Sequence, residues 1–218
     1  MKFIELVRLF QNRPFFETAG VRLAFNESPS QIEARLSRWM NEGKILQLRR
    51  KRYLLAQEYQ RQEASSGYIS NFLYRPSYIS LRTALEIYGL IPESVKVQEA
   101  ITTKKTAEWK TPIGTFKYYS IKKKRFWGYR TYPEGKNRIP KQQQFLLAEP
   151  EKTLLDLFYL MEGEWTAERI YEMRFQELDI IKKERLQLFT KRFDSPKVTR
   201  AVDCFLNMKA TTEHTEKK

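Results

Sequence analysis

The sequence predicts an α+β fold, in which short helices and a hairpin precede an antiparallel sheet with flanking helices. Two periodicities carry this prediction. Apolar residues recur every three or four positions up to about residue 41 and again from Pro150, which is typical of amphipathic helices. Between about residues 95 and 148 apolar and polar residues alternate, and short turns separate the runs, which predicts consecutive antiparallel strands.

The first two helices are predicted from apolar spacing and from residues that end helices. The first helix ends near residues 12–14, where Pro14 cannot continue it. The second runs over about residues 18–25, and Asn26 and Glu27 form the turn that follows. The apolar face of the first helix carries Phe3, Leu6, Val7 and Phe10.

A third helix is predicted over residues 29–41. Ser28 can cap the free N–H groups at its start, Pro29 suits the first turn, and Gly43 ends it. The opposite face is short, polar and basic, which suits a helix lying in a DNA major groove. Taken alone, this stretch is better explained as an ordinary amphipathic surface helix. The predicted buried stripe is Ile32, Leu36, Trp39 and Met40.

The residues that follow reverse that interpretation. Residues 44–55 (KILQLRRKRYLL) predict two short strands around a basic tip, residues 49–52. A helix, a glycine exit and a hairpin with a cationic tip make the layout of a winged helix-turn-helix. In that layout the helix reads base edges and the wing holds phosphates. We therefore predict a winged helix-turn-helix DNA-binding domain over residues 1–60.

Roles for individual side chains follow from this layout. Arg38 is the strongest candidate for a base contact, because a guanidinium can bridge two acceptors of guanine. Four neutralised phosphates per protomer would give a dimer a slope of log K against log salt of roughly −7. The predicted base contacts are Gln31, Ala34, Arg38 and Asn41. The predicted phosphate contacts are Ser28, Ser30, Arg35, Ser37, Arg49, Arg50, Lys51 and Arg52.

The rest of the chain is predicted to form one regulatory α+β domain over residues 68–209. Residues 57–67 (QEYQRQEASSG) are polar and are expected to form a linker or the frayed end of a connecting helix, and residues 210–218 a flexible tail. Ser80 is predicted to cap a helix that Gly89 closes. The predicted strands lie at about 95–101, 113–121, 125–132 and 143–148, and four helices follow.

Composition limits the classes of function. The formal charge of +14 favours a polyanionic partner, most often nucleic acid. Residues 1–56 hold 11 basic and 5 acidic groups, and residues 101–141 hold 12 and 2, so two basic zones are expected. The single Cys204 excludes an internal disulfide and fits a reducing cytoplasm. Neither a signal peptide nor a run of ~20 apolar residues is present, so no membrane partner is expected.

The second basic zone leaves three interpretations open. A run of four cations lies at a predicted turn between aromatic-rich segments. It could be a solvated tip that discourages edge pairing, a secondary surface for DNA or an acidic partner, or part of a single-strand or RNA-binding sheet over residues 113–132. Alternation should bury about half of the aromatic residues. The cations are Lys122, Lys123, Lys124 and Arg125.

Catalysis is not expected. Glu149, Glu151 and Asp156 could serve a nucleic-acid-processing enzyme, and this is the alternative from the enzyme class. Glu149 and Glu151, however, lie at a predicted helix start, where acidic side chains interact favourably with the helix dipole. No serine elbow, metal-ligand set or phosphate-binding loop accompanies them, and the lone His214 lies in the predicted tail. We therefore expect no catalytic residue, metal or cofactor.

Two motifs extend the functional prediction: residues 77–93 (SYISLRTALEIYGLIPE) and residues 148–157 (AEPEKTLLDL). With the N-terminal layout, they make the chain resemble the AbiEi-type antitoxins of bacterial abortive-infection toxin–antitoxin systems over about residues 1–165. The resemblance implies an autorepressor that binds promoter inverted repeats as a homodimer and neutralises a nucleotidyltransferase-like toxin. Wings of that family usually carry a glycine before the tyrosine, where this chain has Lys51 and Arg52 before Tyr53.

Overall fold

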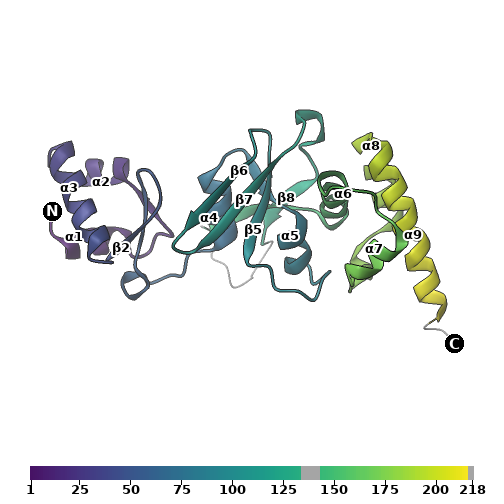
Figure 1. Ribbon diagram of the computed structural model, residues 1–218. Helices are drawn as coiled ribbons and strands as arrows, with labels where there is room; N and C mark the ends of the chain where they lie inside the picture. Colours follow the sequence, from purple (N-terminus) through teal and green to yellow (C-terminus); the bar gives the residue numbers. More distant parts are fainter. Residues whose placement is uncertain (134–142, 216–218) are drawn as a thin grey trace.

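The computed structural model describes residues 1–133 and 143–215 and has the predicted α+β class. The body is elongated (Figure 1). The first three helices and a small sheet lie at one end, a larger sheet occupies the middle, and the last three helices lie at the other end. The predicted DNA-binding residues and the C-terminal helices are therefore on opposite sides of the larger sheet.

The N-terminal end is built from three helices and three short strands around one apolar cluster. The strands form an antiparallel sheet in the order β1-β3-β2. β1 escapes prediction, because two residues are too few to show alternation. The helices match their predicted ranges and are α1 (Phe3–Phe10), α2 (Thr18–Ala24) and α3 (Pro29–Asn41). The strands are β1 (Phe16–Glu17), β2 (Ile45–Arg49) and β3 (Arg52–Leu55), and the short helix η1 (Gln57–Tyr59) follows.

Local chemistry explains the bounds of α3. Ser28 Oγ accepts from the backbone N–H of Gln31 at 3.3 Å, and Gln31 Oε1 accepts from the backbone N–H of Ser28 at 3.0 Å, which makes a reciprocal cap. Gly43 ends the helix with a left-handed φ of +71°. The predicted apolar stripe is confirmed, with Ile32, Leu36 and Trp39 buried and Met40 half-buried.

The prediction of a linker over residues 57–67 is wrong at its C-terminal end. Helix α4 (Ser66–Leu73) begins there, and Ser65 is its N-cap. Gly67 packs under the ring of Phe145, and a Cβ atom at this glycine would lie 2.7 Å from that ring. Serine and glycine, which are typical of flexible segments, here make a capped and closely packed helix start.

The larger sheet has six strands in the order β6-β7-β5-β4-β9-β8. The prediction of a purely antiparallel sheet is wrong, because β5 lies parallel to β7 and β4 lies parallel to β9. β6 accounts for the first of these pairs: it forms a hairpin with β7, so the chain reverses twice between β5 and β7. The strands are β4 (Ser77–Ile79), β5 (Val97–Thr102), β6 (Ala107–Thr111), β7 (Gly114–Ser120), β8 (Tyr129–Tyr132) and β9 (Phe145–Ala148).

Three of the four predicted strands correspond to β5, β7 and β9, and the fourth is shorter than expected. Its first residues form a 3-10 helix, η2 (Lys123–Arg125), and β8 begins only at Tyr129. β6 and β4 escape prediction. β6 (AEWKT) carries a single large apolar side chain, and β4 has only three residues, so neither shows a clear period of two.

The two faces of the larger sheet pack against different helices. Alternation along the strands sends Ile79, Ala100 and Leu147 to the face that α4 covers, and Tyr78 and Ile101 to the other face. The predicted tail is wrong for residues 210–215, where the last helix continues, and residues 216–218 lie outside the described residues. The helices that build the second core are α5 (Leu81–Ile87), α6 (Pro150–Leu160), α7 (Ala167–Glu172), α8 (Lys183–Phe193) and α9 (Pro196–Thr215), with the short η4 (Leu178–Ile180) between α7 and α8.

The two sequence motifs 77–93 and 148–157 meet in a buried polar cluster. Lys152 and Asp156, one turn apart on α6, form an ion pair with both side chains fully buried. The hydroxyls of Tyr78 and Ser80 donate to Asp156 Oδ2 at 3.0 and 2.9 Å. Ser80 is therefore not the side-chain cap that the sequence predicts. Burial raises the pKa of Asp156 and lowers the pKa of Lys152, and the charge of each partner opposes the shift of the other.

Candidate nucleic-acid interface

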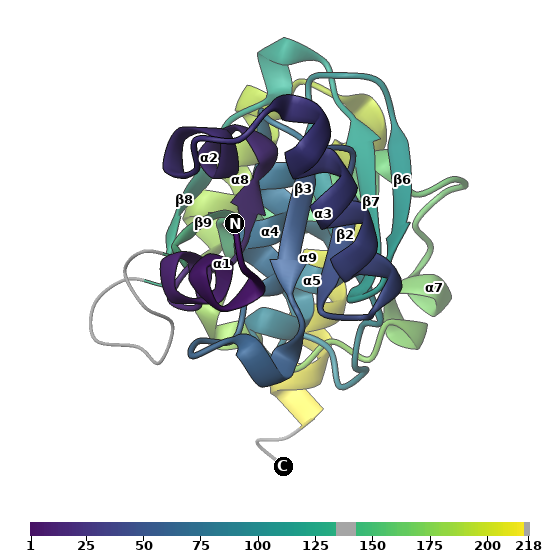
Figure 2. The same cartoon turned by 90° about the vertical axis from the view of Figure 1, so that its left-hand side faces the viewer.

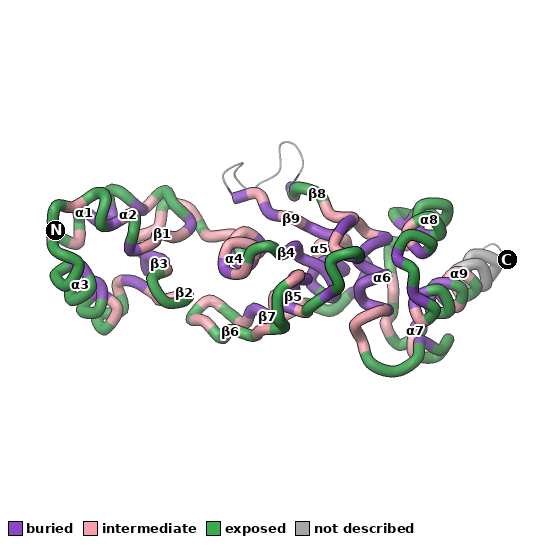
Figure 3. Tube along the Cα trace, turned by 90° about the horizontal axis from the view of Figure 1, so that it is seen from above, coloured by how far each residue is buried: buried purple, intermediate pink, exposed green. Residues whose placement is uncertain are grey.

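The outer face of α3 lies at the free end of the molecule. Figure 2 looks at that end and shows α2 and α3 in front of the strands, and Figure 3 shows the exposed side of α3. The seven residues of the predicted interface with exposed side chains on or before this helix are Ser28, Ser30, Gln31, Ala34, Ser37, Arg38 and Asn41. The described part of the chain therefore leaves the predicted base-reading face uncovered.

The residues at the start of α3 are already hydrogen-bonded to one another. Ser28 Oγ lies 3.1 Å from Ser30 Oγ, and the cap uses the side-chain oxygen of Gln31. Gln31 is a predicted base contact, and the capping bond engages the same side chain. A base contact by Gln31 would need its amide nitrogen, or the loss of one capping bond.

Carboxylates partner both arginines of α3. Arg35 Nε lies 3.0 Å from Glu27 Oε2, and Arg38 Nε lies 3.7 Å from Glu42 Oε1. The pKa of Glu42 is lowered chiefly by a hydrogen bond from Lys44, with a smaller contribution from the charge of Arg38. The side chain of Arg38 is 59% exposed and that of Arg35 only 38%. Arg38 is therefore the more accessible of the two to a base edge.

The hairpin tip differs from the prediction of four equivalent phosphate contacts. Arg49 and Arg52 are cross-strand neighbours in β2 and β3, and both donate to the backbone carbonyl of Leu73, at 3.0 and 3.1 Å. The Arg49 guanidinium lies 4.3 Å from the ring centroid of Trp109, and that of Arg52 lies 4.6 Å from Phe72. These two arginines join the hairpin to the C-terminal end of α4. Arg49 is exposed and Arg52 half-buried, and a phosphate contact by either would compete with these internal contacts.

The other two cations of the tip, Arg50 and Lys51, are exposed and do not contact the Leu73 carbonyl. Lys51 has a left-handed φ of +65°, a conformation that glycine adopts without strain. Its carbonyl accepts from the backbone N–H of Thr18 at 3.1 Å, which ties the tip to the start of α2. Glu17, Ala19 and residues 49–52 line a hollow of about 460 Å³ beside it.

The left-handed Lys51 predicts a gain of stability on substitution by glycine. An L-residue in this region is strained by about 1–2 kcal/mol, and glycine offsets part of the relief through its larger unfolded-state entropy. We expect Lys51→Gly to raise the free energy of unfolding, measured in urea, by about 1 kcal/mol. Lys51→Ala removes the same charge but keeps the strain, so it should show no such gain. Equal stability of the two variants would contradict the explanation.

The hairpin belongs to two apolar cores at once. Ile45 and Leu55 pack in the N-terminal cluster with Trp39, whereas Leu48 and Leu54 pack in the cluster under α4 and the larger sheet. The ring of Phe15 also lies 3.8 Å, centroid to centroid, from that of Phe72 in α4. The hairpin therefore packs against both the N-terminal helices and the larger sheet with α4.

The second basic zone is divided in the structure. Lys122, Lys123 and Lys124 are exposed, and Lys124 pairs with Asp194 at 3.0 Å. Arg125 is buried, and it donates to the carbonyl oxygens of Phe193 and Asp194 at 2.8 and 2.5 Å. The prediction of Arg125 as part of a binding surface is therefore wrong. It holds η2 to the C-terminal end of α8 instead.

The aromatic residues of segment 113–132 do not form an open stacking surface. Phe116, Tyr118 and Trp127 are buried in the two cores. Phe126 and Tyr129 are half-buried beside each other, with ring centroids 5.3 Å apart. Single-stranded bases stack on exposed rings. This arrangement weighs against the single-strand alternative.

The three carboxylates of the enzyme alternative are all engaged within the chain. Glu149 pairs with Arg185, which also lies 3.7 Å from Glu151 Oε2. Glu151 accepts from the backbone N–H of Lys182 at 3.0 Å. Asp156 lies in the buried cluster already described. Within residues 1–133 and 143–215, no group of three or more His, Cys, Asp or Glu side chains is placed to hold a metal ion. No described helix is long and apolar enough to cross a membrane.

The sequence matches no protein-family model and no curated protein.

Proposed function

We propose that the chain is a sequence-specific, double-stranded-DNA-binding transcriptional regulator whose residues 1–60 act as a winged helix-turn-helix. The observation that supports this most directly is the exposed, polar and basic face of α3 at one end of the molecule. In the proposed complex α3 enters the major groove, where Arg38 contacts a guanine. Arg50 and Lys51 contact phosphates, and Arg49 and Arg52 position the hairpin.

The regulator acts on promoter inverted repeats as a homodimer, with half-sites about one helical turn, or a multiple, apart. Occupancy of the promoter blocks transcription sterically. The resemblance to AbiEi-type antitoxins supports a further part of the proposal, in which the protein neutralises a nucleotidyltransferase-like toxin. A neighbouring reading frame for such a toxin is the expected genetic arrangement. The absence of toxin neutralisation would leave DNA binding to be tested by itself.

The test separates base reading from phosphate binding. Duplexes that bind the full chain are selected from a randomised pool, and affinities are measured by fluorescence anisotropy at one fixed salt concentration. We expect Arg38→Ala to cost about 1–3 kcal/mol on the selected duplex and little on a scrambled one. Arg50→Ala should weaken both duplexes similarly, because a phosphate contact carries no sequence information.

Arg82→Ala is the matched control, because Arg82 is an exposed arginine on α5, outside the interface. It should leave both affinities within twofold. Failure to enrich any duplex, or equal losses on both duplexes for Arg38→Ala and Arg50→Ala, would refute the assignment. Preference for a single-stranded oligonucleotide of equal length would favour the alternative single-strand or RNA-binding function.

A further inference from the structure

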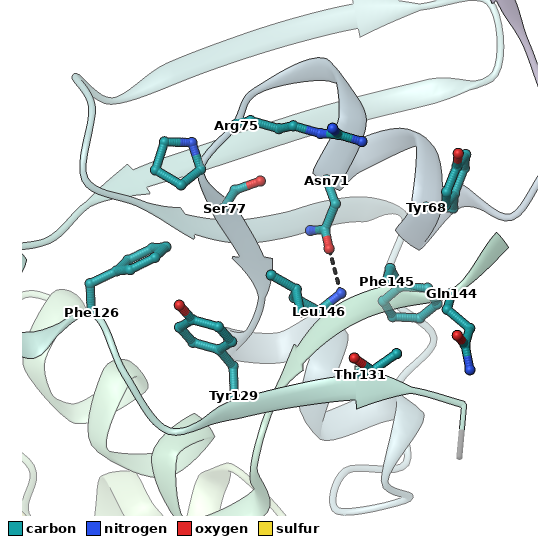
Figure 4. Close-up of a pocket in the computed structure, with 11 residues that line it drawn as sticks. Tyr68, Asn71, Arg75, Ser77, Phe126, Tyr129, Thr131, Gln144, Phe145 and Leu146 are labelled. Carbon is teal, nitrogen blue, oxygen red and sulfur yellow. Dashed lines mark hydrogen bonds between the residues drawn. The ribbon is translucent and has the colours of Figure 1, made fainter. Parts of the chain in front are cut away.

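A pocket of about 390 Å³ lies between the end of α4, β4 and the pair β8–β9. Figure 4 shows Asn71, Arg75 and Ser77 along one side of it and Phe126, Tyr129 and Thr131 along the other. Its volume falls in the range of sites that hold small organic molecules. It is separate from the proposed DNA-binding face, which lies on α3 and the hairpin tip.

Two hydrogen-bond donors in this pocket lack partners. The side-chain oxygen of Asn71 accepts from the backbone N–H of Leu146 at 2.5 Å, which fixes the amide orientation and leaves the NH₂ group as the free end. Asn71 Nδ2 and Ser77 Oγ are buried and have no hydrogen-bond partner among the described residues. Buried polar atoms without partners are uncommon, because they lose water without a replacement. An acceptor group on a ligand would supply the missing partner.

The donor side of the pocket is held in place before any ligand binds. Ser77 begins β4 and is paired with Thr102 of β5. Thr102 Oγ1 also donates to the carbonyl of Pro76 at 2.7 Å, so the backbone on both sides of the Ser77 amide is fixed. Because this backbone is already ordered, ligand binding does not incur the conformational-entropy cost of ordering it.

Charge and shape define the class of ligand. The exposed guanidinium of Arg75 is at the rim, 5.1 Å from the ring centroid of Phe72, and no carboxylate is among the described residues that line the pocket. Phe126 and Tyr129 supply aromatic surface opposite the donors. A flat ring packs well on aromatic side chains, and an anionic group suits a guanidinium.

We propose that the pocket binds a small organic anion that carries a planar ring, such as a nucleotide or an aromatic carboxylate. Its acceptor oxygen takes hydrogen bonds from Asn71 Nδ2 and Ser77 Oγ, its ring packs on Phe126 and Tyr129, and its charge lies at Arg75. The inference does not rest on the proposed DNA-binding function, and its test uses no DNA.

The test is calorimetric titration of the full chain with adenosine 5′-monophosphate and, separately, with 4-hydroxybenzoate. The two probes distinguish a nucleotide from an aromatic carboxylate, and inorganic phosphate supplies the charge without a ring. We expect at least one aromatic anion to bind with a Kd below about 1 mM and inorganic phosphate to bind at least tenfold more weakly. The proposal is overturned if neither aromatic anion binds at this concentration, or if inorganic phosphate binds equally well.

Ser77→Ala gives the sharpest variant, because the hydroxyl has no internal partner to lose. It should leave the thermal midpoint unchanged and weaken probe binding about three- to tenfold. Arg75→Gln should weaken binding at least as much, whereas the charge-matched Arg82→Gln on α5 should not change it. Binding that Ser77→Ala and Arg75→Gln both leave within twofold of the unmodified chain would also overturn the proposal.

Discussion

Replacing Lys152 by methionine is expected to lower the free energy of unfolding by about 3–5 kcal/mol. The substitution leaves the fully buried carboxylate of Asp156 without its ion-pair partner. Tyr78 and Ser80 still donate to that carboxylate, but two hydroxyls do not neutralise a charge in a low-dielectric interior. Urea unfolding of the single variant, followed by far-UV circular dichroism, measures the loss.

A double variant shows whether the charge or the packing is responsible. Lys152→Met with Asp156→Leu removes both members of the pair and keeps the volume apolar, so it should recover much of the loss. A double variant less stable than Lys152→Met alone would contradict the explanation. A single variant within 1 kcal/mol of the unmodified chain would do so too.

The pH dependence of Lys152→Met should have a definite sign. Without the lysine, burial acts on Asp156 unopposed by that charge, so the pKa of Asp156 in the folded state lies above its unfolded value of about 3.9. The folded state then holds the proton more tightly than the unfolded state. Stability of the variant should therefore be greatest below about pH 4 and should fall as the pH rises through the raised pKa. Unfolding curves between pH 4 and 8 would show this.

Removing both outward cations of the hairpin should flatten the salt dependence of DNA binding strongly. Each phosphate contact adds about 0.9 to the slope of log K against log salt, so Arg50→Ala with Lys51→Ala should reduce the slope of a two-protomer complex by roughly 3.6. Between 50 and 200 mM salt this difference amounts to roughly 150-fold in relative affinity. Anisotropy titrations of one duplex at four salt concentrations give the slope.

The inward arginines of the same hairpin supply the comparison. Arg49 and Arg52 donate to the Leu73 carbonyl and lie over aromatic rings, so they are engaged within the chain. Arg49→Gln with Arg52→Gln removes an equal charge and should change the slope by less than one unit. If both double variants flatten the slope equally, the division of the tip into outward and inward cations is wrong.

Caps, glycine stops and apolar spacing were sufficient to predict α1, α2 and α3, because these signals are local. Strand pairing is not local. Nothing in the segment around β6 indicates that it forms an edge strand paired with β7, which leaves β7 parallel to β5. The reciprocal cap engages Gln31, which the sequence also offers as a base contact, and the spacing of Ser28 and Gln31 is the signal that could have indicated it.

Similar reasoning explains why the charged residues of the candidate site were only partly predictable. Arg125 and its three lysine neighbours look equivalent in sequence, but only the guanidinium reaches the carbonyls at the end of α8. The tip of the hairpin was predicted with four equivalent cations. Arg49 and Arg52 donate to the Leu73 carbonyl, which distinguishes them from Arg50 and Lys51. The pocket beside Asn71 and Ser77 brings together residues from three separate stretches, 68–77, 126–131 and 144–146, so no single stretch of sequence marks it.

The hairpin contributes to both apolar cores, so a truncated protein that ends near residue 60 would not keep the structure that these residues have in the full chain. The truncation exposes Leu48 and Leu54 to solvent. It also removes the Leu73 carbonyl, to which Arg49 and Arg52 donate hydrogen bonds. Exposed leucines beside unpaired guanidinium groups would promote self-association of the fragment and its non-specific binding to polyanions. Non-specific DNA binding by such a fragment would therefore not test the proposed sequence-specific binding of the full chain.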